Sequence, residues 1–173
     1  MYLRNLKIED AKGMYDWMHD TSVTKYFDKD FSSYTIDDCI KFINNNLSYD
    51  DRPLNVHFAI IDGLEKYSGT VSLKNIDYDL KTSEFAIILM KEAQGSGLAI
   101  KAFNEIIDYA FNKLNLDFVY FSCKKNNLAA NKFYSKTNAK KIDYNKLVEK
   151  LGGGVEGYNL NYIPTLLWYI IIK

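Results

Sequence analysis

The sequence predicts an α/β fold, in which one sheet of short strands is flanked by helices. Short runs rich in β-branched and aromatic residues recur between turn signals, as in strands. Other stretches repeat an apolar residue every three or four positions, as amphipathic helices do. The chain has 173 residues and shows no internal repeat, low-complexity tract or linker that would divide it. We therefore assign residues 1–173 to a single domain.

The first part of the chain predicts one strand and two helices. The strand is expected at residues 2–6, and the helix after it places its apolar residues on one face. Residues 21–33 are polar and aromatic and are expected to form a loop. Thr35 then suits a helix N-cap, with Asp38 at the third helical position. The apolar positions are Ala11, Met14, Tyr15 and Met18 in the first helix, and Ile36, Ile40, Ile43 and Leu47 in the second.

The middle of the chain predicts an antiparallel meander. Three runs, at residues 56–61, 67–76 and 82–89, have the composition of strands. The turn residues Asp62-Gly63 and Asp77-Tyr78-Asp79 separate these runs, so consecutive strands are expected to pair as neighbours.

The second half of the chain continues the alternation. A long helix is expected from about Gly97 to Leu114, with an apolar stripe toward the core. Residues 145–162 show weak periodicity and contain the glycines Gly152 to Gly154, so we expect a mobile insertion that could act as a substrate lid. The remaining elements are strands at 118–122, 140–144 and 165–172, and a helix from about 128 to 136.

The loop between the apolar run 85–90 and the long helix has the features of an anion site. Its backbone amides and the positive end of the helix dipole point the same way. Gly95 and Gly97 would let phosphates approach the backbone without a Cβ in between. The loop and the start of the helix consist of Gln94, Gly95, Ser96, Gly97, Leu98 and Ala99.

Three phosphate-binding classes are excluded by spacing and composition. A dinucleotide fingerprint requires a third small residue where Ile100 stands. A P-loop ends in Gly-Lys-Ser/Thr, whereas this loop continues as Gly97-Leu98-Ala99. An ATP site would also need a metal-binding acid and a phosphate-facing Lys or Arg in the loop, and neither is there.

The pattern Gln94-x-x-Gly97-x-Ala99, followed by Asn127 and then Tyr134, resembles the GNAT family of acetyl-CoA-dependent N-acetyltransferases. The resemblance covers nearly the whole chain and rests on the order strand, loop, helix, strand, Asn and Tyr. It implies a mixed, mostly antiparallel seven-stranded sheet flanked by about four helices. It also implies that acetyl-CoA is wedged between two splayed central strands.

The resemblance assigns residues to the cofactor. In the family, the strand before the glycine loop pairs its backbone with the pantetheine arm, the loop amides hold the pyrophosphate, and an asparagine binds the arm. A tyrosine near the sulfur returns a proton to the departing thiolate. The matching residues are Ile87, Ile88 and Leu89 in the strand, Gln94, Gly95, Ser96, Gly97, Leu98, Ala99 and Ile100 in the loop and helix start, Asn127, and Tyr134 as catalytic acid.

The resemblance also implies direct transfer in a ternary complex, without a covalent enzyme intermediate. The acceptor amine must then lose a proton, and Glu84 at the start of the strand is our first candidate for the base. His57 is the alternative because its reference pKa lies near neutrality. Ser122 and Tyr120 could relay the proton through water.

Several of these residues have structural alternatives that the sequence leaves open. Asn127 suits a plain helix N-cap, and Tyr134 suits a core aromatic beside Phe133. The aromatic residues of the N-terminal half belong either to the core or to the substrate pocket. They are Trp17, Tyr26, Phe27, Phe31 and Tyr34.

The acceptor is the least specified part of the prediction. Leu3-Arg4 and the segment Trp17 to Asp20 resemble the branch of the family that holds ribosomal-protein and amino-sugar N-acetyltransferases. We favour a primary amine of a small molecule, such as an amino sugar. The alternatives are a protein N-terminus or a non-catalytic acyl-CoA-binding module on the same fold.

Composition sets the remaining expectations. Lys and Arg together number 22, as do Asp and Glu, so the formal net charge is zero and gives no reason to expect a nucleic-acid partner. Cys39 and Cys123 are expected to be free thiols, and no metal site is expected. Residues 166–172 are far shorter than the ~20 residues that span a bilayer, and no signal peptide is apparent. We therefore expect a cytoplasmic monomer or homodimer that binds no membrane.

Overall fold

The computed structural model describes residues 2–46, 51–153, 155 and 161–173. These residues form a seven-stranded sheet in the order β1-β2-β3-β4-β5-β7-β6. Neighbouring strands are antiparallel except for β4 and β5, which are parallel. The strands are β1 (Leu3–Asn5), β2 (Val56–Ile61), β3 (Tyr67–Asp77), β4 (Thr82–Leu89), β5 (Phe118–Lys124), β6 (Lys140–Ile142) and β7 (Leu166–Ile172). The predicted mixed, mostly antiparallel sheet is confirmed.

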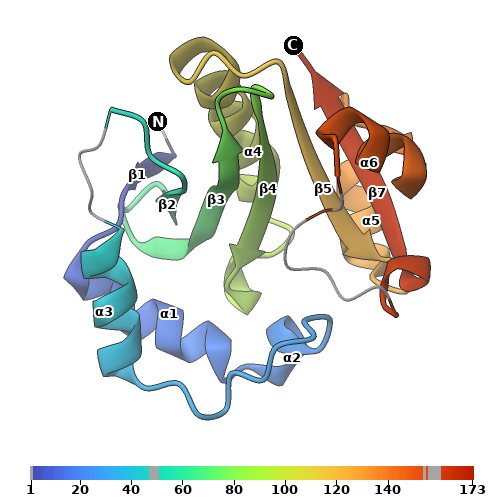
Figure 1. Cartoon of the computed structure of the whole chain (residues 1–173). Helices are drawn as coiled ribbons and strands as arrows, with labels where there is room; N and C mark the ends of the chain where they lie inside the picture. Colours follow the sequence, from blue (N-terminus) through green and yellow to red (C-terminus); the bar gives the residue numbers. More distant parts are fainter. Residues whose placement is uncertain (1, 47–50, 154, 156–160) are drawn as a thin grey trace.

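Helices cover both faces of the sheet (Figure 1). One core cluster joins the sheet to α4 and α5, a second joins β2 to β4 with α1 and α3, and a third joins α6 to β5 and β7. The helices are α1 (Ala11–Met18), α2 (Thr21–Thr24), α3 (Ile36–Asn45), α4 (Leu98–Asp108), α5 (Leu128–Tyr134) and α6 (Tyr144–Leu151). The described residues thus hold six α-helices where the sequence indicated about four.

Helix α2 lies within the segment 21–33 that was expected to be a loop. The Asp20 carboxylate accepts a hydrogen bond from the Ser22 amide at 2.8 Å, and Val23 is buried. One apolar residue in a single turn is too little for a periodic pattern, so this helix could not be predicted from apolar spacing.

Helix α6 corrects the expected insertion at residues 145–162. Asp143 caps it by accepting from the Asn145 amide at 2.9 Å, Leu147 is fully buried, and Gly152 ends it with φ 65°. The first part of the segment is therefore a packed helix. The part of the prediction that concerns Gly154 and residues 156–160 lies outside the described residues.

The long helix and the second N-terminal helix form as predicted. Helix α4 continues into one wider π-helical turn at η3 (Tyr109–Lys113), so the helical path ends near the expected residue. In α3, the Asp38 amide donates to Thr35 Oγ1 at 3.2 Å, and the Thr35 amide donates to Asp38 Oδ2 at 3.0 Å. This reciprocal pair is the capping box that the sequence indicated.

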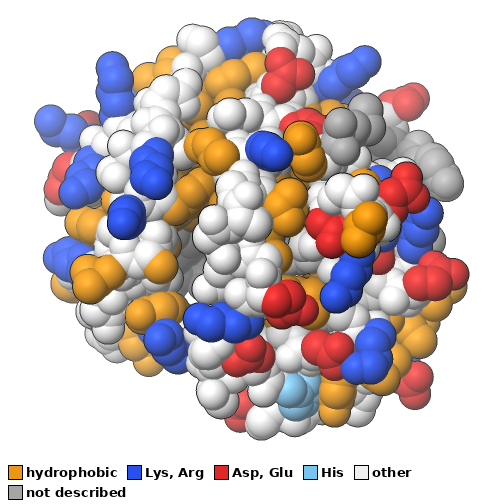
Figure 2. Space-filling view, turned by 180° about the vertical axis from the view of Figure 1, so that it is seen from behind, with side chains coloured by type: hydrophobic (Ala, Val, Ile, Leu, Met, Phe, Trp, Pro, Cys, Tyr) orange, Lys and Arg blue, Asp and Glu red, His pale blue; other side chains and the backbone are white. Residues whose placement is uncertain are grey.

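Two further findings concern surface and thiols. No helix among the described residues is long and apolar enough to cross a membrane. Figure 2 shows acidic and basic side chains on the same face, with apolar side chains scattered between them. Cys39 is buried, Cys123 is half-buried, and both are free thiols, as expected.

Candidate active site

A cleft opens where the two central strands diverge. Strands β4 and β5 share three residue pairs, of which Glu84 with Tyr120 is the last. Beyond this pair β4 stays with β3 up to Leu89, and β5 stays with β7 up to Lys124. Figure 1 shows the two strands separating toward α2. The cleft between them has a volume of about 490 Å³.

The edge of β4 lends main-chain groups to this cleft. The Met90 amide donates to the Ser68 carbonyl at 2.9 Å, so it points toward β3. Because main-chain groups alternate along an antiparallel strand, the Ile88 amide points toward β3 as well. The amides of Ile87 and Leu89 therefore point toward the cleft. All three predicted strand residues line the cleft, but the main-chain amide of Ile88 is directed into the sheet.

The loop before α4 exposes backbone at the same cleft. Gly95 and Gly97 have φ of 81° and 84°, in the left-handed region that favours glycine. A Cβ at either position would meet no atom within 4 Å, so the space over the loop is open. Gly97 is also the N-cap of α4, where the first helical amides lack intrahelical acceptors. The loop thus fits the phosphate groups of a bound cofactor.

Hydrogen bonds within the loop hold it against β4. The Gln94 side-chain amide donates to the Leu89 carbonyl at 3.3 Å. The Ser96 hydroxyl donates to the Ala93 carbonyl at 2.6 Å and accepts from the Leu98 amide at 3.3 Å. The Leu98 side chain is buried and anchors the start of α4. Among the predicted loop residues, the cleft is lined by Gln94, Gly95 and Ala99, while Ile100 lies half-buried in the first turn of α4.

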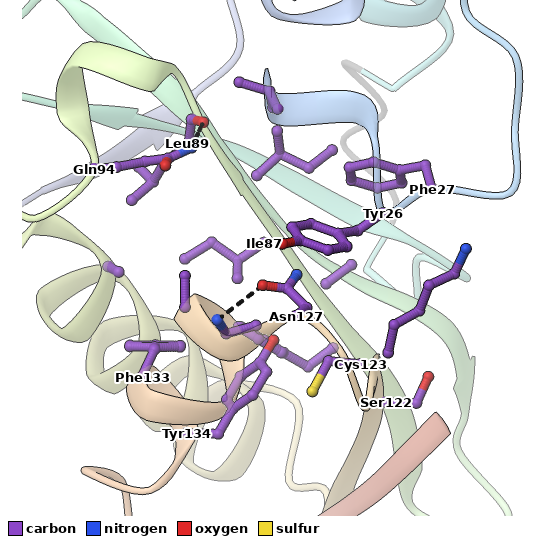
Figure 3. A pocket seen from close by; sticks show the side chains of 18 of the residues that line it. Tyr26, Phe27, Ile87, Leu89, Gln94, Ser122, Cys123, Asn127, Phe133 and Tyr134 are labelled. Carbon is purple, nitrogen blue, oxygen red and sulfur yellow. Dashed lines mark hydrogen bonds between the residues drawn. The ribbon is translucent and has the colours of Figure 1, made fainter. Parts of the chain in front are cut away.

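Asn127 is a helix N-cap whose side chain also reaches the cleft, so the N-cap alternative is confirmed and the cofactor contact stays a prediction. It is the N-cap of α5, where its Oδ1 accepts from the Ala130 amide at 3.1 Å. Its side chain also lines the cleft, as Figure 3 shows. Its side-chain nitrogen has no partner within the described part of the chain, so this donor is available to a ligand.

Tyr134 lies in the last turn of α5 with its ring held in an aromatic cluster. The ring centroids of Phe121, Phe133 and Tyr169 lie 4.5, 4.9 and 5.2 Å away. Burial, and then the neighbouring Cys123 and Tyr169, raise the pKa of the Tyr134 phenol well above its usual value. The Tyr134 phenol therefore keeps its proton at neutral pH.

The Tyr134 hydroxyl is directed at the cleft rather than used inside the cluster. It has no hydrogen-bond partner among the residues that the structure describes, although the ring is only 6% exposed. In Figure 3 the oxygen points toward the side chains of Asn127 and Cys123. The ring therefore belongs to the core, and the role of the hydroxyl as catalytic acid stays a prediction.

Glu84 lies at the closed end of the opening, where the pairing of β4 and β5 stops. Its side chain is buried, with 4% of the residue exposed, and lines the cleft. Lys74 Nζ donates to Oε1 at 3.1 Å, and Asn75 Nδ2 donates to Oε2 at 3.3 Å. The carboxylate is thus held by one cation and one amide on β3.

The sequence match decides the family. A family model described as an acetyltransferase (GNAT) domain matches residues 1–140. This chain belongs to the GNAT acetyltransferase family. The match includes the glycine loop, Asn127, Tyr134 and every residue of the cleft lining except Leu166, so the predicted family is confirmed.

Two relatives of this chain are named as spermidine acetyltransferases. Spermidine N(1)-acetyltransferase of Vibrio cholerae is 29% identical over 119 residues, which are 68% of this chain and 66% of that protein. Spermidine N(1)-acetyltransferase of Escherichia coli K12 is 32% identical over 139 residues, which are 78% of this chain and 69% of that protein. These alignments span about two thirds of the relatives' length.

Solved GNAT structures share the fold over almost the whole chain. The Vibrio cholerae spermidine N-acetyltransferase in complex with CoA and spermine has a TM-score of 0.77 at 22% identity, and covers 99% of this chain and 94% of that one. A dodecameric form of the same enzyme has a TM-score of 0.70 at 22% identity, with 98% and 92% covered. At this identity the likeness establishes the fold, which confirms the predicted GNAT architecture.

The alternative base His57 lies outside the cleft lining of this GNAT domain. Its Nδ1 is 2.7 Å from the Ser72 hydroxyl oxygen. Burial, and then the charge of Lys74, lower the pKa of His57 to about 4, which makes it a weak base at neutral pH. Of the two predicted relay residues, Ser122 lines the cleft and Tyr120 is buried beside Glu84 in the strand register.

The N-terminal aromatic residues divide between core and cleft. Trp17 and Phe31 are buried, with ring centroids 5.4 Å apart. Tyr26 and Phe27 line the cleft on the side of α2, where Figure 3 shows them facing β4. Next to them Asp28 forms an ion pair with Lys124 at the end of β5.

Asn131 is a site residue that sequence reasoning missed. The Cys123 thiol and the Tyr169 hydroxyl both donate to its Oδ1, at 3.1 and 3.2 Å. Its Nδ2 donates to the carbonyls of Lys124 and Lys125 at 3.4 and 3.0 Å. Asn131 therefore ties α5, which carries the tyrosine, to the end of β5. The available signal was its position one helical turn after the N-cap of α5, on the same side of the helix.

No group of three or more His, Cys, Asp and Glu side chains could hold a metal within the part of the chain that the structure describes. One solved relative, from Vibrio cholerae, is a complex with manganese ions. Metal independence thus stays a prediction.

Proposed function

We propose that this chain is an acetyl-CoA-dependent N-acetyltransferase that moves an acetyl group directly to a primary amine of a small molecule. The observation that carries the proposal is the divergence of β4 and β5 after Glu84. It leaves a strand edge, a two-glycine loop at a helix start and a protonated phenol around one cleft. Family membership supports the same reading.

Acetyl-CoA would bind along the open edge of β4. The amides of Ile87 and Leu89 are the main-chain groups that suit the pantetheine arm and the thioester carbonyl oxygen. The open space over Gly95 and Gly97 suits the pyrophosphate, since no Cβ intrudes and helix-start amides are near. The free side-chain amide nitrogen of Asn127 is a donor for the arm. This assignment refines the prediction by leaving the main chain of Ile88 out.

Two side chains would handle the protons. The amine nitrogen attacks the thioester carbonyl carbon, an oxyanion forms against backbone amides, and the carbon–sulfur bond then breaks. Glu84 accepts the proton that leaves the amine, directly or through water, and Tyr134 donates its phenolic proton to the departing sulfur. The proton held by Glu84 then passes to the Tyr134 phenolate through water, which resets both side chains, so each turnover yields one acetylated amine and one free thiol.

A polyamine is the acceptor that we propose to test first. The two relatives described above are named spermidine N(1)-acetyltransferases. Their names favour a polyamine over the amino sugar that the sequence suggested. Within the described residues the cleft is lined by the carboxylates of Glu84 and Asp28, each paired with a lysine, and by the aromatic rings of Tyr26 and Phe27. The faces of such rings attract ammonium ions. The expected cytoplasmic location remains a prediction. The expected monomer or homodimer also remains a prediction, since one solved relative is a dodecamer.

The test is the release of free CoA thiol from acetyl-CoA with a panel of amines. The panel holds spermidine, spermine, glucosamine and a short peptide with a free N-terminus. We expect thiol release with a polyamine at a rate well above hydrolysis. Release with the peptide alone would favour the protein N-terminal alternative. Binding of acetyl-CoA without release for any amine would favour the non-catalytic module.

A further inference from the structure

Strand β3 carries an irregularity opposite Glu84. Its register with β4 pairs Lys74 with Glu84 and next pairs Asp77 with Thr82. Between these two pairs β3 contains one more residue than β4. Asn75 takes up the difference with φ 50°, a left-handed conformation that is uncommon for residues other than glycine. The irregularity is therefore a β-bulge, of the kind that redirects side chains.

The bulge brings two consecutive side chains to one carboxylate. In a regular strand the side chains of residues 74 and 75 would point to opposite faces of the sheet. Here Lys74 Nζ lies 3.1 Å from Glu84 Oε1, and Asn75 Nδ2 lies 3.3 Å from Oε2. The main-chain amide of Asn75 donates to Asn55 Oδ1 at 3.0 Å, which holds the backbone of the bulge. Each carboxylate oxygen thus has its own donor.

This arrangement orients the carboxylate. Lys74 donates to one of its oxygens and Asn75 to the other. Because Glu84 is only 4% exposed, solvent does little to orient it, and these charge-assisted hydrogen bonds help to set its plane.

We propose that the β3 bulge positions the proton acceptor of the reaction, with Asn75 as the positioning residue that holds Glu84 Oε2 opposite Lys74. The inference rests on the proposed function, because it assigns Asn75 a role through Glu84. It predicts that the side-chain amide of Asn75 matters to turnover although Asn75 touches neither the cofactor nor the sulfur.

Other charged and titratable groups surround the same carboxylate. Lys74 approaches from β3 and Tyr120 from β5, and the ion pair of Asp28 with Lys124 lines the same cleft. His57 lies beyond Lys74 on β2 and stays neutral because its pKa is lowered to about 4. A new charge at position 75 would therefore act on Glu84 against this fixed background.

The test compares two substitutions at the bulge with one elsewhere. Asn75→Gly keeps the left-handed backbone and deletes the side-chain amide. Asn75→Asp keeps the shape and places a second carboxylate beside Oε2. Asn115→Gly is the matched control, because Asn115 also has a positive φ, of 53°, and its Oδ1 accepts from Lys173 Nζ rather than from a cleft residue.

With acetyl-CoA and spermidine, Asn75→Gly is expected to lower kcat by about tenfold or more, the range set by a hydrogen bond to a charged group, with KM for acetyl-CoA unchanged. Asn75→Asp is expected to move the acidic limb of the pH–rate profile to higher pH, because like charges disfavour ionisation of the pair. Asn115→Gly should leave both unchanged. In a crystal structure of Asn75→Gly, the Glu84 carboxylate should be turned from its present plane.

Three results would overturn the proposal. Wild-type kcat and pH profile in both Asn75 variants, with a profile altered by Glu84→Gln, would remove the positioning role and leave the proposed function standing. An unchanged profile in Glu84→Gln would remove both the base and its positioning residue. An unmoved carboxylate in the Asn75→Gly structure would refute the positioning role whatever the activity.

Discussion

Replacing Tyr134 by phenylalanine isolates the chemistry of its hydroxyl from the packing of its ring. The ring is held by Phe121, Phe133 and Tyr169 at centroid distances of 4.5 to 5.2 Å, and phenylalanine keeps these contacts. The hydroxyl has no hydrogen-bond partner within the described residues, so its removal leaves no buried group unpaired. We therefore expect a free energy of unfolding within about 0.5 kcal/mol of wild type.

The expected catalytic cost is much larger. A positioned general acid contributes roughly 10²- to 10⁴-fold to a rate, and the raised pKa of Tyr134 keeps its proton available over the whole neutral range. Thiol release from acetyl-CoA by Tyr134→Phe should fall by that factor in kcat. KM for acetyl-CoA should change little, because the cofactor contacts that we propose lie on β4 and the glycine loop.

Tyr169→Phe is the matched control, since it removes a hydroxyl from the same aromatic cluster. That hydroxyl donates to Asn131 Oδ1 at 3.2 Å, so its loss should cost about 1 kcal/mol of stability and only a small part of kcat. A Tyr134→Phe enzyme with wild-type kcat would refute the assignment of the acid. Equal losses of kcat in the two variants would show that packing of the cluster, rather than a proton, is being measured.

Three further predictions concern the loop, a half-buried histidine and a helix cap. Gly97→Glu should abolish the rise in melting temperature caused by acetyl-CoA, whereas Gly152→Glu, with a similar positive φ of 65° and no Cβ neighbour, should keep it; equal loss in both would contradict the loop assignment. Because the pKa of His57 falls from 6.5 unfolded to about 4 folded, the unfolded state binds this proton first as pH falls. Stability should thus decline by up to about 3 kcal/mol between these values, and urea titrations of His57→Gln should show a shallower decline. Thr35→Ala should cost about 1 kcal/mol of stability without changing kcat, and a thermal melt with no shift would deny the capping box its role.

Local chemistry made much of the fold predictable. The Thr35 and Asp38 capping box, the stripe of α4 and the turn residues of the meander all act within a few positions of the chain. Helix α2 was not predicted because its only buried residue is Val23. Helix α6 was not predicted because Leu147 is its one buried residue. The glycines that follow it also dominate the composition of the segment.

Those parts of the candidate site that lie in one sequence motif could be predicted. Those that depend on contacts between distant strands and helices could not. The glycine loop, Asn127 and Tyr134 line or border one cleft as expected. The direction of the Ile88 main-chain amide follows from the register of β3 with β4. That register could not be derived from the sequence. The bulge at Asn75 and the bridge at Asn131 join residues on different elements, so no single stretch of sequence contains either of them.

The most direct test of the account follows the acetyl group itself. Acetyl-CoA labelled in the acetyl carbons would be mixed with the protein and spermidine, and label and free thiol would be quantified together by mass spectrometry. Direct transfer predicts one labelled acetylamine for each free CoA, and no label on the protein. Acetyl-CoA that stabilises the protein against heat, yet leaves every amine of the panel unlabelled, would contradict the proposed activity.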